Sequence, residues 1–252
     1  MAKSKITLLH PHPALLIEED DVHHLIIADL HIGFEERFKA AGVKLRLSTQ
    51  AMLNEITEIC TQQRIDEIII LGDVKFTVGR VSALERREVP IFLEQVSRLA
   101  KTTIVLGNHD GALSTLIPRG VALHLEPYVI IGDVCLLHGH TKLPDLPTDI
   151  SRVVMGHIHP TYLREGSVLS GKHVWLVLKV RREALWSKQS GVIEIYVLPP
   201  LNRELSYVGF AGRTGKIISP IIRRALKGIC DALVLTVEGE IVGYVDALPY
   251  VI

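Results

Sequence analysis

The chain has few of the features that define disulfide-rich or membrane-spanning proteins. Its three cysteines, Cys60, Cys135 and Cys230, are far apart and form no CxxC pair. This excludes a disulfide framework and predicts free thiols in a reducing compartment. No apolar run reaches the roughly 18 residues that a bilayer requires, and no export segment is visible in the sequence. We therefore expect a cytoplasmic protein that does not enter the membrane.

The sequence also has no net charge and few aromatic residues. Its 28 Lys and Arg residues balance its 28 Asp and Glu residues, and aromatic residues make up 5% of the chain. The total charge therefore gives no indication of nucleic acid or an anionic membrane as a partner, and partners must be argued from individual sites. Because 48% of the 252 residues are hydrophobic, the chain is long and apolar enough for a large core.

Five short apolar runs predict strands that are buried on both faces, the usual pattern when helices cover a sheet. They lie at residues 25–28, 68–71, 103–106, 134–137 and 153–155. Between the first two runs, residues 48–64 have a helical apolar period with Ser48 as the N-cap. Between the second and third runs, we expect a helix that begins at Pro90. The alternation of strands and helices indicates an α/β fold.

The part of the chain after Pro160 has a different pattern of apolar stretches, and this pattern predicts a second sheet. Its apolar stretches read as successive strands with one helical turn near residues 220–227. We interpret GFAGRTGK, which begins at Gly209, as a connecting loop because it lacks the P-loop spacing. RREALWSKQ, which contains Trp186, is interpreted as a turn between strands. We expect a single domain over residues 1–252, with the motif-bearing core in 1–160 and the strands of the second sheet in 161–252.

Each of the five apolar runs ends in aspartate, asparagine or histidine. The ends read ADLH, LGDV, LGNHD, LHGH and GHIH. Because parallel strands bring their carboxyl ends to one edge, we expect these segments to converge. Residues two apart project the same way from an extended chain, so Asp29 and His31 can present two donors to one point. The same holds for His157 and His159.

The donor types at these strand ends predict a metal centre. Carboxylates and neutral imidazoles without a thiolate favour Mn, Fe, Zn, Co or Ni over calcium. Seven or eight donors exceed one tetrahedral site, but they suit two ions about 3.5 to 4 Å apart that share a carboxylate, the arrangement used in phosphoester hydrolysis. Taken singly, a histidine at a strand end is usually structural, and Asp73 or Asn108 could be turn residues. The prediction therefore depends on all five motifs occurring together.

The ordered set DxH, GD, GNHD, HGH and GHxHP resembles the calcineurin-like metallophosphoesterase superfamily. Within it, LGDVK and VVMGHIHP are similar to an archaeal branch related to the double-strand-break repair nuclease subunit. The motifs extend from Asp29 to His159, in the order of the family. The resemblance implies a four-layer αββα sandwich of two mixed β-sheets flanked by helices.

The resemblance also implies a role for each motif residue. The expected metal ligands are Asp29, His31, Asp73 and His159 for one ion, and Asp73, Asn108, His138 and His157 for the other. His109 would contact the phosphate and protonate the leaving oxygen, and Asp110 would hold its imidazole. His140 is expected to support the ligands. Phe76 stands where many members have an acidic or polar residue, and Lys75 before it is expected to reach substrate phosphate or solvent.

The leading hypothesis is a hydrolase in which metal-activated hydroxide attacks a phosphoester. Two divalent ions are expected, manganese first, with Fe, Zn, Ni or Co as alternatives. Phosphodiesters, with nucleic acid among them, are the leading substrates, and phosphomonoesters or nucleotides are the alternative. A non-catalytic, metal-holding interaction module is the rival from another class, although His109 and Asp110 have no reason to accompany a structural metal. The metallo-β-lactamase pattern HxHxDH is not met by HIHPTY. The sequence predicts no oligomeric state.

Overall fold

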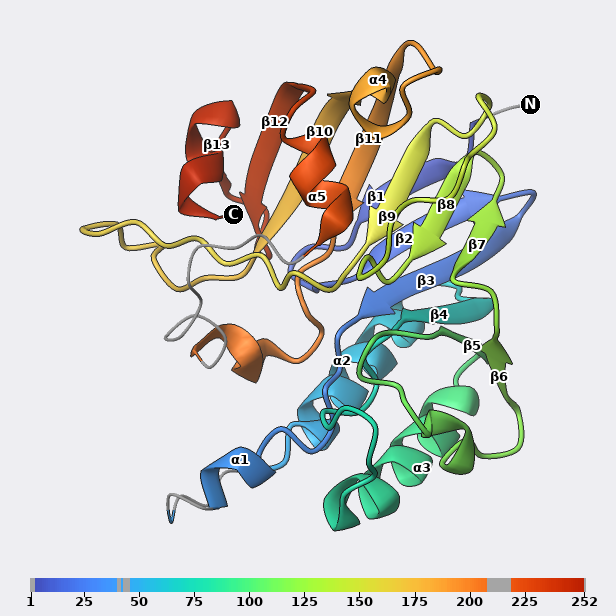
Figure 1. Cartoon of the computed structure of the whole chain (residues 1–252). Helices are drawn as coiled ribbons and strands as arrows, with labels where there is room; N and C mark the ends of the chain where they lie inside the picture. Colours follow the sequence, from blue (N-terminus) through green and yellow to red (C-terminus); the bar gives the residue numbers. More distant parts are fainter. Residues whose placement is uncertain (1–2, 40–41, 43–45, 208–218, 252) are drawn as a thin grey trace.

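The computed structural model describes residues 3–39, 42, 46–207 and 219–251, and their strands form two mixed sheets (Figure 1). The 6-stranded sheet has the order β1-β2-β3-β4-β5-β6. Its strands are β1 (Lys5–Leu8), β2 (Leu15–Glu19), β3 (Val22–Ala28), β4 (Glu67–Leu71), β5 (Lys101–Val105) and β6 (Val121–His124). The 7-stranded sheet has the order β13-β12-β10-β11-β9-β8-β7. Its strands are β7 (Tyr128–Ile131), β8 (Val134–Leu137), β9 (Arg152–Met155), β10 (Val174–Arg181), β11 (Val192–Val197), β12 (Ile229–Thr236) and β13 (Ile241–Gly243).

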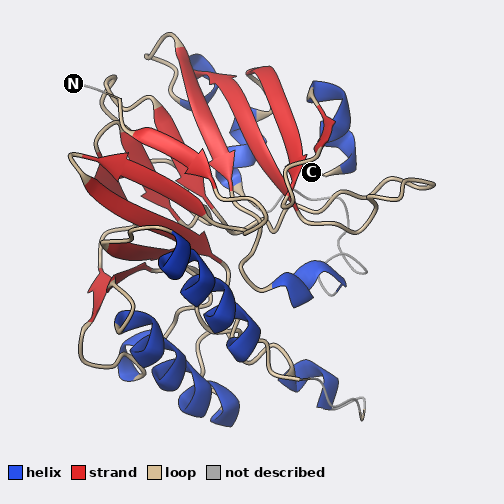
Figure 2. Ribbon diagram, turned by 180° about the vertical axis from the view of Figure 1, so that it is seen from behind, coloured by secondary structure: helices blue, strands red, loops and turns tan. Residues whose placement is uncertain are grey.

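Helices cover the outer face of each sheet, so the molecule has four layers (Figures 1 and 2). The longer helices, α2 (Thr49–Gln62) and α3 (Ala83–Ser97), pack on the first sheet. The second sheet is covered by α4 (Arg182–Leu185), α5 (Pro220–Ala225) and the 3-10 helix η3 (Val245–Tyr250). The remaining helical turns are α1 (Glu36–Lys39), η1 (Leu113–Thr115) and η2 (Arg203–Tyr207). The predicted αββα sandwich is confirmed.

The central strands are buried on both faces because their side chains alternate between two cores. On β3, Leu25 and Ile27 pack with the residues of α2 and α3. The intervening Ile26 and Ala28 belong to the core between the two sheets, which also contains the fully buried Trp175. This alternation is the period of two expected of an extended strand. Each large apolar side chain buried in this way contributes about 1.5–3 kcal/mol relative to an exposed one.

The two long helices differ in how well the sequence predicts their start. Helix α2 begins after Ser48, as predicted, although the Ser48 hydroxyl donates to a Glu35 carboxylate oxygen at 2.8 Å instead of capping the helix. Helix α3 begins at Ala83, so the prediction of a start at Pro90 is wrong. Ser82 accepts a hydrogen bond from the Glu85 amide, and the Glu85 carboxylate accepts one from the Ser82 amide. This reciprocal capping box fixes the start, and Pro90 lies inside the helix.

The C-terminal half provides β10, β11 and β12 at the positions where strands are expected, and α5 is the expected helical turn. Helix α4 occupies the turn between β10 and β11, where Trp186 is buried and its indole N–H donates to the Pro144 carbonyl at 2.9 Å. The stretch GFAGRTGK lies outside the described residues. Strands β1, β2, β6 and β7 have no counterpart in the sequence prediction. Within the described ranges, no helix combines the length and the apolar character that crossing a membrane requires.

A buried ion pair ties the turn between β7 and β8 to the start of β9. The guanidinium of Arg152 donates to both carboxylate oxygens of Asp133, and both side chains are 10% exposed. The same carboxylate accepts hydrogen bonds from the Ser4 amide at 3.1 Å and from the Ser151 hydroxyl. Burial alone would raise the pKa of Asp133, but Arg152 and Ser151 lower it to about 2.

Asp133→Ala is expected to destabilise the fold by about 3–5 kcal/mol, because it leaves a buried guanidinium without a partner. Urea unfolding at neutral pH measures this loss. Since the folded pKa is depressed, the stabilisation is present above the ordinary pKa of 3.8 and is lost as the pH falls through about 2. The control is Asp231→Ala, which breaks an ion pair with Lys179 whose side chains are 57% and 49% exposed, and should cost less than about 1 kcal/mol. Equal effects of the two variants would contradict the prediction.

Candidate metal centre

The carboxyl ends of strands from both sheets meet at one place. Strands β3, β4 and β5 of the first sheet end there, and so do β8 and β9 of the second. Backbone hydrogen bonds hold the following loops together: the Asp29 amide donates to the Gly72 carbonyl at 3.2 Å, and the His31 amide donates to the Asp73 carbonyl at 2.8 Å. Across the second sheet, the Gly156 amide donates to the His138 carbonyl at 3.1 Å. The loops that carry the motifs are therefore fixed by the sheets.

The backbone at this edge adopts conformations that L-residues seldom use. Five of the predicted ligands have positive φ angles: Asp29 (57°), His31 (44°), Asp73 (52°), His157 (74°) and His159 (45°). Such residues cost stability and persist only where the surroundings over-determine them, typically at functional sites. Gly72 has a φ of +73°, and a Cβ there would lie 2.7 Å from the Gly107 backbone and from the His138 ring. Glycine thus allows the β4 and β5 loops to touch.

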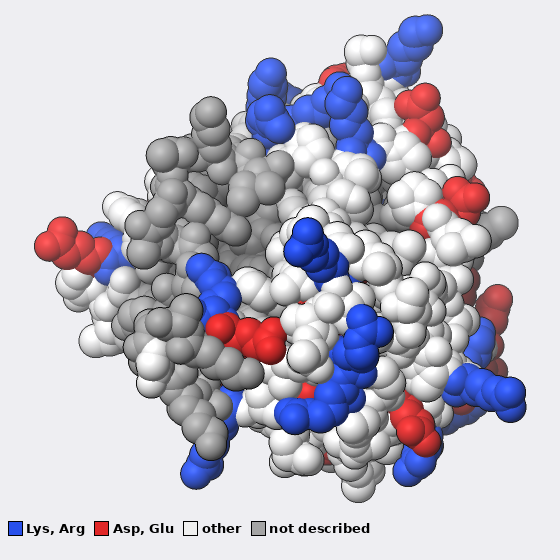
Figure 3. All heavy atoms as spheres, turned by 60° about the horizontal axis from the view of Figure 1, so that its bottom comes forward, with Lys and Arg blue, Asp and Glu red and all other residues white. Residues whose placement is uncertain are grey.

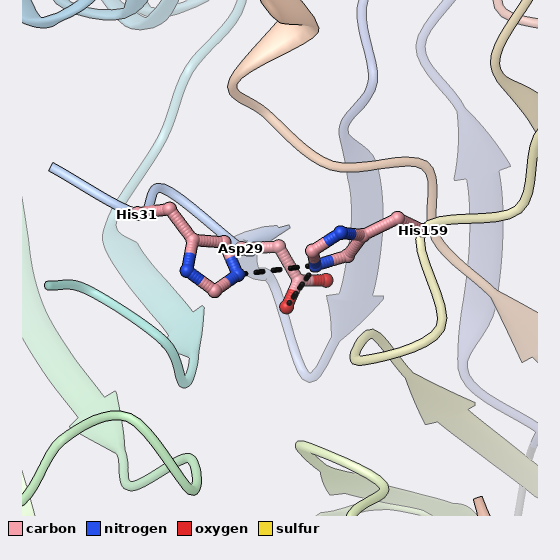
Figure 4. Close-up of side chains that lie close together, drawn as sticks. All are labelled: Asp29, His31 and His159. Atoms are coloured by element: carbon pink, nitrogen blue, oxygen red, sulfur yellow. Dashed lines mark hydrogen bonds and ion pairs between the residues drawn. The ribbon is translucent and has the colours of Figure 1, made fainter. Parts of the chain in front are cut away.

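The first group of donors comes from the β3 and β9 loops (Figure 4). His31 Nε2 lies 3.1 Å from His159 Nε2, and His159 Nε2 lies 3.3 Å from Asp29 Oδ1. Asp73 Oδ2 adds a fourth donor at 3.5 Å from His31 Nε2. The other oxygen of Asp29 accepts a hydrogen bond from the His157 amide at 2.8 Å, which orients the carboxylate.

The second group comes from the β4, β5, β8 and β9 loops and is arranged around His138. Its Nε2 lies 3.1 Å from His157 Nδ1, 3.2 Å from Asn108 Oδ1 and 3.3 Å from Asp73 Oδ2. The other nitrogen of His138, Nδ1, donates to the Leu71 carbonyl at 2.8 Å. Asp73 Oδ2 is thus within 3.5 Å of a donor atom in each group.

The chemistry of these donors fits divalent cations. In the neutral His138 ring the proton is at Nδ1, so Nε2, Asn108 Oδ1 and Asp73 Oδ2 all present lone pairs to one another. Burial would lower the pKa of His138, but the hydrogen bond and the charge of Asp73 raise it to about 9, so the surrounding carboxylates stabilise a positive charge here. In addition, Asp29 Oδ1, which faces His159 Nε2, is buried and has no hydrogen-bond partner among the described residues. Carboxylate, amide and imidazole donors of this kind suit Mn, Fe, Zn, Co or Ni.

The charge states of three further donors, His31, His157 and Asp73, are those that metal binding requires. Burial, followed by the charge of His159, lowers the pKa of His31 to about 3. Burial, followed by the charge of His138, lowers the pKa of His157 to about 3. Both imidazoles are therefore neutral at physiological pH. Burial alone would raise the pKa of Asp73, but the hydrogen bond and charge of His138 hold it below its ordinary value, so its carboxylate is ionised.

His109 lies beside these two groups but is held by another contact than predicted. Its Nδ1 donates to the Phe76 carbonyl, its amide donates to Asp73 Oδ1 at 2.9 Å, and its Nε2 lies 4.0 Å from Asp73 Oδ2. The carboxylate of Asp110 accepts hydrogen bonds from the amides of Asp73, Val74 and Gly107 at 2.8, 2.9 and 2.8 Å. The expectation that Asp110 holds the His109 imidazole is therefore wrong. Asp110 ties the β4 loop to the β5 loop, because buried backbone amides need an acceptor there.

Lys75 does not reach substrate or solvent, so that prediction is also wrong. The side chain is fully buried, and its ammonium donates to the carbonyls of Thr77 and Arg80. Glu85 holds the same loop by accepting hydrogen bonds from the Thr77 amide and hydroxyl, both at 2.6 Å. The capping-box spacing of Ser82 and Glu85 was a signal in the sequence for this loop.

His140 lies beside the second group, and its supporting role stays a prediction. Its ring centroid is 5.3 Å from that of His138 and 6.1 Å from that of His157. Six other histidines, which the sequence assigns to structural or solvated positions, form hydrogen bonds away from the predicted ligands. They are His10, His12, His23, His24, His124 and His173.

The two-sheet sandwich gathers aspartate, asparagine and histidine at its strand ends, as the resemblance to the calcineurin-like metallophosphoesterases implies. The model of the family described as calcineurin-like phosphoesterase matches residues 23–184, and the chain belongs to this family. The matched residues include all the predicted ligands. No curated protein matches the chain.

Solved structures similar to the chain include two proteins that are named for an activity. The Pseudomonas putida nuclease MPE shares 16% sequence identity over 94% of this chain and 98% of its own, with a TM-score of 0.49. The E. coli phosphoesterase Yfce shares 16% identity over 89% of this chain and 98% of its own, with a TM-score of 0.41.

Proposed function

We propose that the chain is a binuclear metal-dependent phosphoesterase of the archaeal branch related to the double-strand-break repair nuclease subunit, with phosphodiesters as its preferred substrates. The proposal of two metal ions rests on one observation: Asp73 Oδ2 lies 3.5 Å from His31 Nε2 and 3.3 Å from His138 Nε2. A single carboxylate oxygen thus faces a complete donor group on either side. Two sites sharing one carboxylate is the arrangement that serves phosphoester hydrolysis.

The proposed ligands are those of the two donor groups. Two bound divalent ions, manganese in our proposal, would supply Lewis-acid activation of water and neutralise charge on the phosphoryl oxygens. His109 is the proposed general acid. The Phe76 carbonyl holds a proton at Nδ1, so a second proton at Nε2 can be delivered to the leaving oxygen. Asp110 is the proposed positioning residue, since it fixes the backbone on both sides of the bridging carboxylate.

Two observations favour phosphodiesters as the preferred substrates. LGDVK and VVMGHIHP are similar to the branch named above. The donor edge is also open, because Asn108 is exposed and His109, His157 and His159 are partly exposed, so substituents on both sides of a phosphate can be accommodated. We further propose that residues 1–252 form one domain. A cytoplasmic location stays a prediction that rests on the three cysteines, which are all free thiols.

Manganese-dependent hydrolysis of bis(p-nitrophenyl) phosphate is the expected result of the first assay. The purified protein is stripped with EDTA, its metal content is measured, and hydrolysis is followed before and after addition of manganese. The diester should be hydrolysed with a higher kcat/KM than p-nitrophenyl phosphate, and only in the presence of metal. A higher value for the monoester would favour the nucleotidase alternative. Two bound metals without hydrolysis of either ester would favour the metal-holding module.

A further inference from the structure

Phe76 forms part of the rim of the metal centre. Its ring centroid lies 6.0 Å from that of His31 and 6.0 Å from that of His109. Its backbone carbonyl accepts the Nδ1 proton of His109, so the backbone that carries the ring is bonded to that imidazole. The side chain is partly exposed. An aromatic face is thus held beside the proposed general acid and is accessible to a ligand.

Arg37 extends this rim outward. It lies on α1, and its guanidinium carbon is 5.5 Å from the centroid of the Phe76 ring. Hydrogen bonds of successive turns connect α1 to the ligand loop, since the Phe34 amide donates to the His31 carbonyl and the Arg37 amide donates to the Phe34 carbonyl. Arg37 is exposed, and none of the carboxylates that the structure describes forms an ion pair with it. The guanidinium is therefore available to an anion.

Because the surface charge is balanced, a single cationic side chain such as Arg37 can decide where an anionic ligand binds. Lys and Arg side chains are interspersed with Asp and Glu side chains among the coloured atoms of the face in Figure 3, and the net charge of the chain is zero. The nearby Lys75 is buried and bonded to carbonyls. An anionic ligand at this edge is thus recognised by particular side chains such as Arg37, and general attraction to a basic surface contributes little.

An aromatic ring beside an unpaired guanidinium matches the chemistry of a nucleic-acid strand. A flat base can stack on the ring or on the guanidinium plane, and the guanidinium can bind a phosphate through two hydrogen bonds. We infer that Phe76 and Arg37 form a subsite for the nucleoside on the leaving-oxygen side of the cleaved phosphate and for the phosphate that follows it. This inference rests on the proposed function, because His109 places the leaving oxygen next to Phe76. Single-stranded nucleic acid is the substrate class it names.

The test compares Phe76→Leu, Phe76→Tyr and Arg37→Gln with the wild type on a short oligothymidylate in manganese. Phe76→Leu should raise KM by roughly tenfold, within the range of one lost stacked base, and Phe76→Tyr should restore it. The slope of log(kcat/KM) against log[salt] is expected to be negative, and Arg37→Gln should make it less steep by about 0.7. This is the contribution of one phosphate contact on a single strand. Binding of a fluorescein-labelled oligothymidylate in EDTA, followed by anisotropy, provides a readout without turnover.

Arg86→Gln is the matched control, because Arg86 is an exposed arginine on α3. It should keep the wild-type salt dependence. If the wild type cleaves the oligothymidylate and both rim variants match it, the subsite is refuted while the proposed function stands. If Arg37→Gln loses as much on bis(p-nitrophenyl) phosphate as on the oligothymidylate, the subsite is also refuted, since the small diester has no second phosphate. If the wild type hydrolyses no diester, the proposed function itself fails.

Discussion

Asp73→Ala is expected to remove both of the proposed metal ions and to abolish turnover. Its Oδ2 is the oxygen that faces a donor group on either side, at 3.5 Å from His31 Nε2 and 3.3 Å from His138 Nε2. Without it, each group loses its shared anionic donor, and the remaining imidazoles bring mutually repelling lone pairs together. The metal content of dialysed protein, measured by elemental analysis, should fall from about two ions per chain to about none. The kcat for bis(p-nitrophenyl) phosphate should fall at least about a thousandfold, in line with the loss of metal-supplied stabilisation.

Asn108→Ala is the informative comparison because Asn108 belongs to one group only, at 3.2 Å from His138 Nε2. It should reduce the content to about one ion per chain, since the group of Asp29, His31 and His159 is complete without it. Circular dichroism of both variants checks that the sandwich has folded. Retention of two ions by Asp73→Ala would contradict the shared site, and equal losses in the two variants would contradict the assignment of Asn108 to one side.

The strand-end motifs predicted the convergence because each motif needs only local information. Asp73 follows a buried apolar run, and so do His157 and His159. Each of these short segments therefore indicates both where a strand ends and which donors follow it. Because parallel strands end at a common edge of the sheet, these donors are then expected to lie close together. The structure adds that the edge is a joint one, formed by β3, β4 and β5 of one sheet and by β8 and β9 of the other.

Two of the wrong predictions concern side chains whose partners are backbone groups. Lys75 binds the carbonyls of Thr77 and Arg80, and Asp110 binds amides of the β4 loop. Nearly every residue has a backbone carbonyl and amide, so the residue types in the sequence could not predict these contacts. The pairing of Arg37 with Phe76 was missed for a related reason: it brings together two motif-flanking segments, and neither carries a pattern of its own.

The positive φ angles at the ligands connect the fold to its proposed chemistry. Asp29, Asp73 and His157 each have a positive φ within two residues of a strand end. Their loops are held by the Gly72 carbonyl, by Asp110 and by the Asp29 carboxylate. The strained conformations are therefore maintained by the same network that places the donors. Metal-free protein should retain this arrangement, since these bonds are all between protein groups.

His109→Gln is expected to lower turnover while leaving the metal content at the wild-type level. The imidazole is adjacent to Asp73, with Nε2 at 4.0 Å from Oδ2, but in the proposed roles it binds no metal. Removing a general acid typically costs a factor of about a hundred to ten thousand. The loss should depend on the leaving group, because p-nitrophenolate departs without a proton whereas a nucleoside hydroxyl needs one. The kcat for an oligothymidylate should therefore fall by about that factor, and the kcat for bis(p-nitrophenyl) phosphate should fall much less.

His124→Gln is the matched control for this prediction. His124 is a partly buried histidine whose Nε2 donates to the Tyr128 carbonyl at 2.9 Å, on the edge strand β6. Its replacement removes an imidazole of similar burial without touching either donor group, so the ratio of the two rates should stay at the wild-type value. Equal losses on both substrates in His109→Gln would instead assign His109 to phosphate binding, because charge stabilisation at the phosphoryl oxygens is needed whatever the leaving group is. A fall in metal content would place His109 among the ligands, as the third donor of the group that it forms with His31 and Asp73.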